Sequence, residues 1–211
     1  MLIAPFEGDL AEALASAAQG AGWKVGLAWR GGSVEEGDGA ASHPKGTLLP
    51  WNPASYVSAG ALALTATSAL GEIDVLVLVC DPKTSETSLY DGSAGRLGTA
   101  FEAAVTGPLY LTREMIRRFE TVKAGRLLLV SAEAEPNTSW STLVGAAFRG
   151  LGETAFARAR GATWSAWGLA ERSGKIEAAA EFALRLLEEQ KTAKSGRWLP
   201  YNGKSGIFGV F

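Results

Sequence analysis

The sequence predicts an α/β protein built on a doubly wound parallel sheet, and three observations lead to this prediction. Two apolar runs without alternation, Asp74–Val79 and Arg126–Ser131, are typical of strands covered by helices on both faces. Amphipathic segments with helical spacing separate the short apolar runs along the chain. The 211 residues contain no linker and no internal repeat, so we expect one domain over residues 1–211.

The remaining strands are expected where short apolar runs stand between helical segments. Before the two long runs, they are Leu2–Ala4, Lys24–Ala28 and Thr47–Leu49, and a later one is Trp164–Trp167. A glycine- and acid-rich stretch over residues 31–46 predicts a mobile loop between the second and third strands. Alternation of such strands with helices is typical of a parallel sheet with helices on both faces.

Helices are expected from amphipathic periodicity and from residues that favour helix ends. Asn52, followed by Pro53, is the expected N-cap of a helix that continues to Leu70. Apolar residues recur at helical spacing across the segment after Asp74–Val79, although Pro108 lies near its middle. The expected helices are Leu10–Gln19, the segment that ends at Leu70, Thr99–Phe119, Leu143–Ala159 and Ile176–Gln190.

Composition argues against several classes of function. The net charge is −2 and no run of basic residues occurs, so we expect binding neither to nucleic acid nor to an anionic membrane. The longest apolar runs, about six residues, are far shorter than a membrane span. A single cysteine, Cys80, allows no internal disulfide, and Met1–Asp9 does not resemble a signal peptide. We therefore expect a cytoplasmic protein without a metal, since Cys80 and the single His43 cannot form an ordinary zinc site.

Segments in order along the chain resemble the motifs of the short-chain dehydrogenase/reductase family. Gly71–Val77 resembles its GxIDVLV strand, Val105–Arg113 its NVxGxxxLTR helix and Gly125–Ser131 its GRIVxISS strand. Ala146–Leu151 resembles its KAAxxGL segment, and Ser195–Gly203 its TGxxLxVDGG close. Because the match covers nearly the whole chain, the resemblance implies a Rossmann-like sheet flanked by helices on both faces.

The resemblance places the family's nucleotide-binding positions on residues that lack the required chemistry. The glycine-rich TGxxxGxG turn, whose backbone approaches a pyrophosphate, falls on Ala4–Ala11. The acidic residue that binds the ribose falls on Trp29, and the NNAG turn falls on Leu78–Asp81. The substituted positions are Pro5, Asp9, Ala11, Trp29 and Leu78. We therefore expect no cofactor, although Arg30 remains as a ligand for a 2′-phosphate.

Glu7 adds a second anion to this turn. A carboxylate about 4 Å from a phosphate charge costs about 4 kcal/mol at an effective dielectric constant of 20. Micromolar binding corresponds to only about 8 kcal/mol. This repulsion alone is therefore expected to remove about half of an ordinary cofactor affinity.

The resemblance also implies that the acid–base residues of the family are missing. In the family, a tyrosine exchanges the proton of the alcohol and a lysine four residues later lowers the pKa of that tyrosine. The tyrosine and lysine positions hold Ser141 and Gly145, and the supporting serine and asparagine positions hold Ala132 and Ala104. No Tyr-x-x-x-Lys occurs anywhere in the chain, so we expect no catalysis of the family's kind.

The resemblance further implies subunit contacts through two long helices. In the family, the helices that correspond to Thr99–Phe119 and Leu143–Ala159 pack against the same pair of a neighbour. Both segments keep an apolar pattern beyond the needs of one sheet face. The expected interface residues are Val105, Leu109, Met115, Phe119, Val144, Phe148, Leu151 and Phe156.

Three functions remain open at this point. We favour a catalytically inactive subunit or scaffold that forms a homo- or hetero-oligomer with an active homologue, because the catalytic positions changed while the apolar helix pattern was kept. The first alternative is an NAD(P)-dependent oxidoreductase with an unrecognised site. The second is a regulatory module that binds a small ligand in the former cleft, near Trp29, Trp51 and Cys80.

Overall fold

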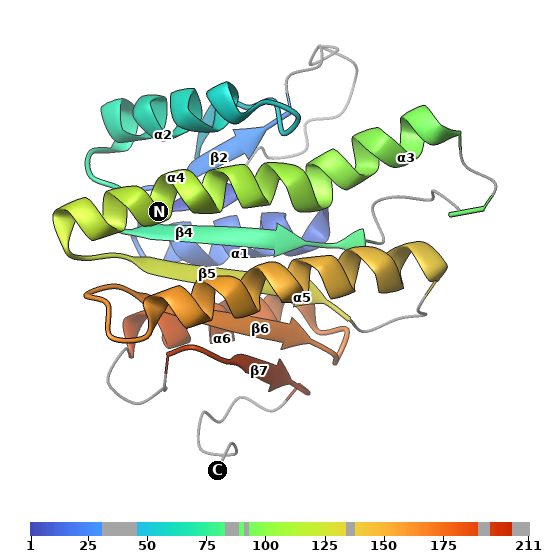
Figure 1. The fold of residues 1–211 in the computed structure, drawn as a ribbon. Coiled ribbons are helices and arrows are strands. Elements are labelled where there is room, and N and C mark those ends of the chain that lie inside the picture. Colours follow the sequence, from blue (N-terminus) through green and yellow to red (C-terminus); the bar gives the residue numbers. More distant parts are fainter. Residues whose placement is uncertain (31–45, 83–88, 91–92, 134–137, 190–194, 204–211) are drawn as a thin grey trace, which may run out of the picture.

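Seven strands, all parallel, form one sheet in the part of the chain that the structure describes (Figure 1). This structure is a computed structural model, and it describes residues 1–30, 46–82, 89–90, 93–133, 138–189 and 195–203. In sheet order the strands are β3 (Thr47–Pro50), β2 (Gly26–Trp29), β1 (Leu2–Ala4), β4 (Val75–Cys80), β5 (Arg126–Ala132), β6 (Ser165–Glu171) and β7 (Trp198–Tyr201). The predicted fold class is therefore confirmed, with small shifts at most strand ends and with β7 as a strand that the sequence reading had not assigned.

Helices cover both faces of this sheet. One layer consists of α1 (Gly8–Gly20) and α6 (Ile176–Glu188), which pack against each other. The other layer consists of α2 (Tyr56–Leu70), α4 (Gly107–Val122) and α5 (Ser139–Ala159), with α3 (Ala94–Phe101) extending from the start of α4 (Figure 1). The loop predicted over residues 31–46, which contains His43, lies almost entirely outside the described residues.

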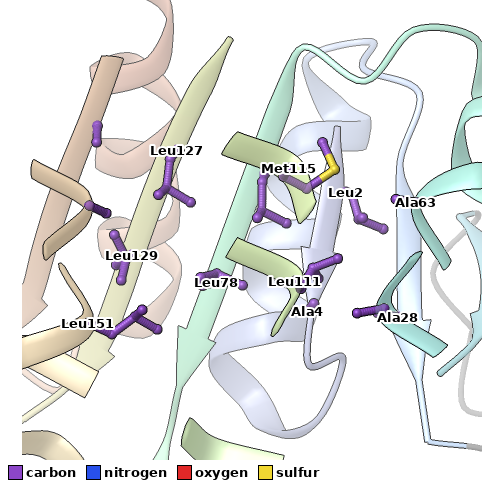
Figure 2. Close-up of a cluster of buried hydrophobic side chains, with 14 of the residues drawn as sticks. Leu2, Ala4, Ala28, Ala63, Leu78, Leu111, Met115, Leu127, Leu129 and Leu151 are labelled. Atoms are coloured by element: carbon purple, nitrogen blue, oxygen red, sulfur yellow. The ribbon is translucent and has the colours of Figure 1, made fainter. Parts of the chain in front are cut away.

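The unbroken apolar runs reflect burial on both faces of the sheet. In β4, Leu78 packs under the α2–α4–α5 layer, whereas its neighbours Val77 and Val79 pack under α1 and α6. Figure 2 shows part of the α2–α4–α5 layer, where Leu111 and Met115 of α4 lie over strand residues that include Leu78. A strand between two helical layers has no solvent-facing side, so its sequence shows no alternation.

The helix predicted over Thr99–Phe119 begins earlier and contains an irregular turn. It runs from α3 through the π-turn η2 (Glu102–Thr106) into α4. At this turn the backbone N–H of Gly107 donates to the carbonyl of Glu102, one residue further back than in an α-helix. Pro108, which has no N–H, follows directly at the start of α4, where a missing donor costs little.

The predicted N-cap of α2 is wrong. Ser55, not Asn52, caps the helix, because its side chain accepts a hydrogen bond from the backbone N–H of Ser58. The side chain of Asn52 instead accepts from the backbone N–H of Ala54, within the loop before the helix. The sequence offered two good capping residues three positions apart, and the chain uses the later one.

Most of the predicted interface residues belong to the core of the single chain. Six of the eight are buried against the sheet: Met115, Phe119, Val144, Phe148, Leu151 and Phe156. In the single chain these six side chains are covered by the protein itself and offer no surface to a partner. Val105 is half-buried, and Leu109 alone of the eight is exposed, with 47% of its surface accessible.

Candidate functional site

The first cleft lies at the carboxyl ends of β1, β2 and β4. It encloses about 440 Å³, within the range of ordinary ligand sites. In sheets of this type, ligands bind where the strand order reverses, and β1 with its neighbours β2 and β4 forms that point here. Its walls come from the ends of these strands, from α3 and η2, and from Trp140 of α5. This cleft corresponds to the position at which the sequence resemblance places the nucleotide.

An ion pair lies across the strand ends at this cleft. Arg30, just after β2, donates from Nε and from its terminal nitrogen to the two carboxylate oxygens of Glu7, the second contact at 2.9 Å. Both residues line the cleft. Arg30 therefore weakens the predicted repulsion between Glu7 and a phosphate but does not remove the carboxylate from the cleft. The same contact engages Arg30, the residue that the sequence had left as a ligand for a 2′-phosphate.

The predicted nucleotide positions do not fit a dinucleotide. Pro5 is buried in the cleft wall and has no N–H to donate to a phosphate. Glu7 is the residue before α1, and its carboxylate caps no N–H of the helix but pairs with Arg30, so a charged pair lies near the helix end at which a pyrophosphate would bind. Asp9, exposed in the first turn of α1, adds a further negative charge. A bound phosphate would therefore meet the carboxylates of Glu7 and Asp9 beside the backbone donors of α1.

The other three nucleotide positions lie away from the centre of the cleft. Ala11 packs in the core between α1 and the sheet, and Leu78 packs in the opposite core layer. Trp29 is half-buried at the end of β2 and does not line the cleft. From the predicted NNAG segment, Cys80 reaches the cleft, but burial raises the pKa of its thiol to about 12. This thiol is therefore uncharged and unreactive near neutral pH.

A second cleft brings together three of the four positions of the missing acid–base set. It encloses about 420 Å³ between the ends of β5 and β6 and the first turns of α5, and Ala132, Ser141 and Gly145 line it. The fourth, Ala104, lines the first cleft. The hydroxyl of Ser141 donates to the carbonyl of Thr138 at 3.0 Å, at the N-cap of α5. Ser141 therefore belongs to the helix cap.

A network of charged residues occupies the second cleft, and the sequence reading did not identify it. The carboxylate of Glu133 accepts from Arg149 of α5, with Nε at 2.9 Å, and from Nε of Arg172 at 3.0 Å. The guanidinium of Arg149 also lies over the ring of Trp198, 5.0 Å from its centre. These contacts tie α5 to the ends of β5 and β6. In the sequence, only the place of Glu133 pointed to this network, because it directly follows Ala132, the position at which the family has its supporting serine.

The two clefts lack the tyrosine–lysine pair that the family uses for proton transfer, within the part of the chain that the structure describes. Neither is lined by a tyrosine or a lysine in the described part of the chain. In the second cleft the ionisable groups are Glu133, Arg149 and Arg172. An arginine does not release its proton in a protein, and both arginines hold the single carboxylate. The arrangement stabilises an ion-pair network at this cleft.

The described residues contain neither a cluster of metal-binding side chains nor a membrane-spanning helix. There, no group of three or more His, Cys, Asp or Glu side chains could hold a metal ion. No helix in these same ranges is long and apolar enough to cross a membrane.

Comparisons with known proteins identify the fold. By sequence, no protein-family model and no curated protein matches the chain. By structure, it is similar to a 3-ketoacyl-(acyl-carrier-protein) reductase from Brucella melitensis complexed with NADH, with a TM-score of 0.74, 17% identity and 97% of each chain covered. It is also similar to a mutant short-chain dehydrogenase/reductase from Serratia marcescens, with a TM-score of 0.73, 15% identity and 97% and 96% of the two chains covered. This chain therefore has the Rossmann-like fold of the short-chain dehydrogenases/reductases, as its sequence motifs predict.

Proposed function

We propose that this chain is a non-catalytic protein with a dehydrogenase fold, which acts as a subunit bound to an active short-chain dehydrogenase/reductase. The observation that carries this proposal is the second cleft. The fold brings Ala132, Ser141 and Gly145 to one place, and a closed ion-pair network lies there in place of a proton donor. Shifting the family motifs by a few residues along the sequence would not supply the missing pair, because neither cleft contains a tyrosine or a lysine among the described residues.

The distribution of exposed apolar side chains supports a partner on one side of the molecule. Among the described residues, the exposed large apolar side chains that lie on helices are Val57, Leu64, Leu109, Val122 and Leu143. All five belong to the α2–α4–α5 layer, and none belongs to α1 or α6. An exposed apolar surface of this kind commonly marks a protein–protein contact.

We assign the contact with the homologue to the outer sides of α4 and α5, with residues that differ from the predicted ones. Leu109 and Leu143 are 47% and 44% exposed there. Beside Leu143, the outer side of α5 carries the small residues Ala146, Gly150 and Ala157. A Cβ added at Gly150 would meet nothing within 4 Å, so no contact inside the chain explains a glycine in the middle of this helix. Small residues let a partner helix approach closely.

The partner contact is tested by a substitution on the surface of α5. Leu143→Glu is expected to abolish co-purification of the homologue from the native host, because a charge would be buried at the centre of the contact. Circular dichroism should show an intact fold, since Leu143 is 44% exposed in the single chain. Ser16→Glu, on the exposed side of α1 in the opposite layer, is the matched control and should keep the partner.

Two results would contradict this part of the proposal. One is the absence of any co-purifying homologue with the unmodified chain. The other is an equal yield of the homologue with Leu143→Glu and with Ser16→Glu.

The loss of catalysis is tested by restoring the missing pair. The double variant Ser141→Tyr with Gly145→Lys is expected to show no NADH-dependent turnover of carbonyl compounds, because Glu7 and Pro5 still obstruct the nucleotide site. The measurement is NADH absorbance with a panel of ketones and aldehydes. Appreciable turnover would show that the acid–base pair was the main defect and would favour an oxidoreductase.

A second candidate function is binding of a small molecule in the first cleft. The observation in its favour is the enclosed volume of about 440 Å³, whose wall combines charged groups such as Arg30 with the apolar surfaces of Pro5 and Trp140. A molecule retained through purification and released on denaturation, identified by mass spectrometry, would favour this function. A chain that releases no such molecule leaves the subunit function as the better supported one.

A further inference from the structure

Helix α2 has an unusual composition for a helix at the surface. None of its 15 residues, Tyr56–Leu70, is charged. Its outward side chains Val57 and Leu64 are 79% and 63% exposed, more than any other aliphatic side chain that the structure describes. By contrast, α1 and α6 present acidic residues such as Glu12 and Glu181 to solvent. A surface helix normally carries charged residues on its outer side, and no described residue covers the outer side of α2.

A glycine in the first half of α2 points to a close contact from outside. Glycine in the interior of a helix destabilises it by up to about 1 kcal/mol relative to alanine. A Cβ added at Gly60 would meet nothing within 4 Å, so the chain itself does not require a glycine there. At Gly107, by contrast, an added Cβ would lie 2.5 Å from Cβ of Pro53, which explains that glycine. A helix of another molecule that crosses α2 at Gly60 would explain why this position holds glycine.

Two large apolar residues of the outer side flank two small ones in the first half of α2. Val57 and Leu64 are two helical turns apart and lie on the same side of α2. The midpoint between them falls between Gly60 and Ala61, the two smallest residues of this surface. If two copies of α2 cross in antiparallel orientation at that point, Val57 of each copy lies beside Leu64 of the other. The small residues meet at the crossing, where the two backbones are closest.

We propose that the outer surface of α2, formed by Val57, Gly60, Ala61, Leu64, Thr65 and Ser68, binds a second copy of this chain in a two-fold antiparallel contact. A two-fold contact places each residue near the symmetry axis against the same residue of the other copy. A surface without charge causes no repulsion in that arrangement, whereas a charged partner would find no ion pair on it. A charged side chain, Arg113, lies 5.1 Å from the ring centre of Tyr56 at the start of α2.

Cysteine cross-linking tests the contact and its geometry. In the proposed arrangement, an Ala61→Cys variant places two thiols within disulfide distance at the crossing. A Ser68→Cys variant, on the same surface, places them about 22 Å apart along the helices, at a rise of 1.5 Å per residue. The native Cys80 is 2% exposed and does not compete. Under mild oxidation, the first variant is expected to form a covalent dimer and the second is not.

Sedimentation of the unmodified chain and of two variants completes the test. The unmodified chain is expected to form dimers at micromolar concentration, and Leu64→Glu is expected to give monomers with an unchanged circular dichroism spectrum. Leu143→Glu should keep this dimer while losing the homologue, so this proposal and the subunit function can fail separately. The proposal is overturned by a monomeric unmodified chain, by equal cross-linking of both cysteine variants, or by Leu64-dependent binding to phosphatidylcholine–phosphatidylglycerol vesicles in place of dimers.

Discussion

Replacing Phe148 with glutamate is expected to leave no folded protein. The sequence pattern had placed Phe148 at a subunit contact, where this change would only separate subunits. In the structure, its side chain is 0% exposed and packs in the core under α5, with its ring 6.3 Å from the ring centre of Trp198. Removing a buried phenylalanine side chain costs about 3–5 kcal/mol. Burying an unpaired carboxylate adds several more, which together match the whole stability of a typical domain.

The measurement is the far-ultraviolet circular dichroism spectrum and the thermal transition of Phe148→Glu. Leu143→Glu, five residues earlier on the same helix and exposed, is the control and should keep the transition of the unmodified chain. A folded Phe148→Glu protein with only its assembly altered would restore the original interface prediction.

Gly168→Ala is expected to destabilise the chain by about 3 kcal/mol, the upper end of the range for overpacking. Gly168 lies in β6 and pairs with Trp198 of β7. An added Cβ would lie 2.3 Å from two atoms of the Trp198 ring. This ring has little freedom to move, because Phe148 and Phe156 pack beside it and the guanidinium of Arg149 lies over it.

Urea unfolding of Gly168→Ala provides the measurement, and Gly150→Ala provides the control. Since a Cβ at Gly150 meets nothing within 4 Å, alanine there should stabilise the isolated chain by up to about 1 kcal/mol. Opposite signs for the two variants are the expected outcome. A Gly168→Ala chain as stable as the unmodified one would show that Trp198 is not held in this position.

The fold was predictable because its strongest signals are local. Runs such as Val75–Cys80 are apolar at every position because both sides of the strand are buried, and this pattern is visible without knowing the neighbours. The order of motifs then fixed the arrangement of the strands. The positions of Ala132, Ser141 and Gly145 around one cleft also followed from this order.

The sequence was least informative where a feature depends on contacts between residues far apart along the chain. Periodicity shows that Phe148 and Leu143 lie on different sides of α5, but it does not show which side faces the sheet. The pairing of Glu7 with Arg30 joins residues on different strand ends, and no local pattern marks it. The network around Glu133 needs two arginines from separate elements, for the same reason.

The central claim, that this dehydrogenase fold has lost its nucleotide chemistry, is tested most directly by calorimetric titration of the purified chain with NADH and with NADPH. The expected dissociation constants exceed about 1 mM, which corresponds to less than about 4 kcal/mol of binding free energy. The reason is the ion pair of Glu7 and Arg30 and the missing donor at Pro5 in the first cleft. Binding of either nucleotide with a low-micromolar dissociation constant would contradict the claim.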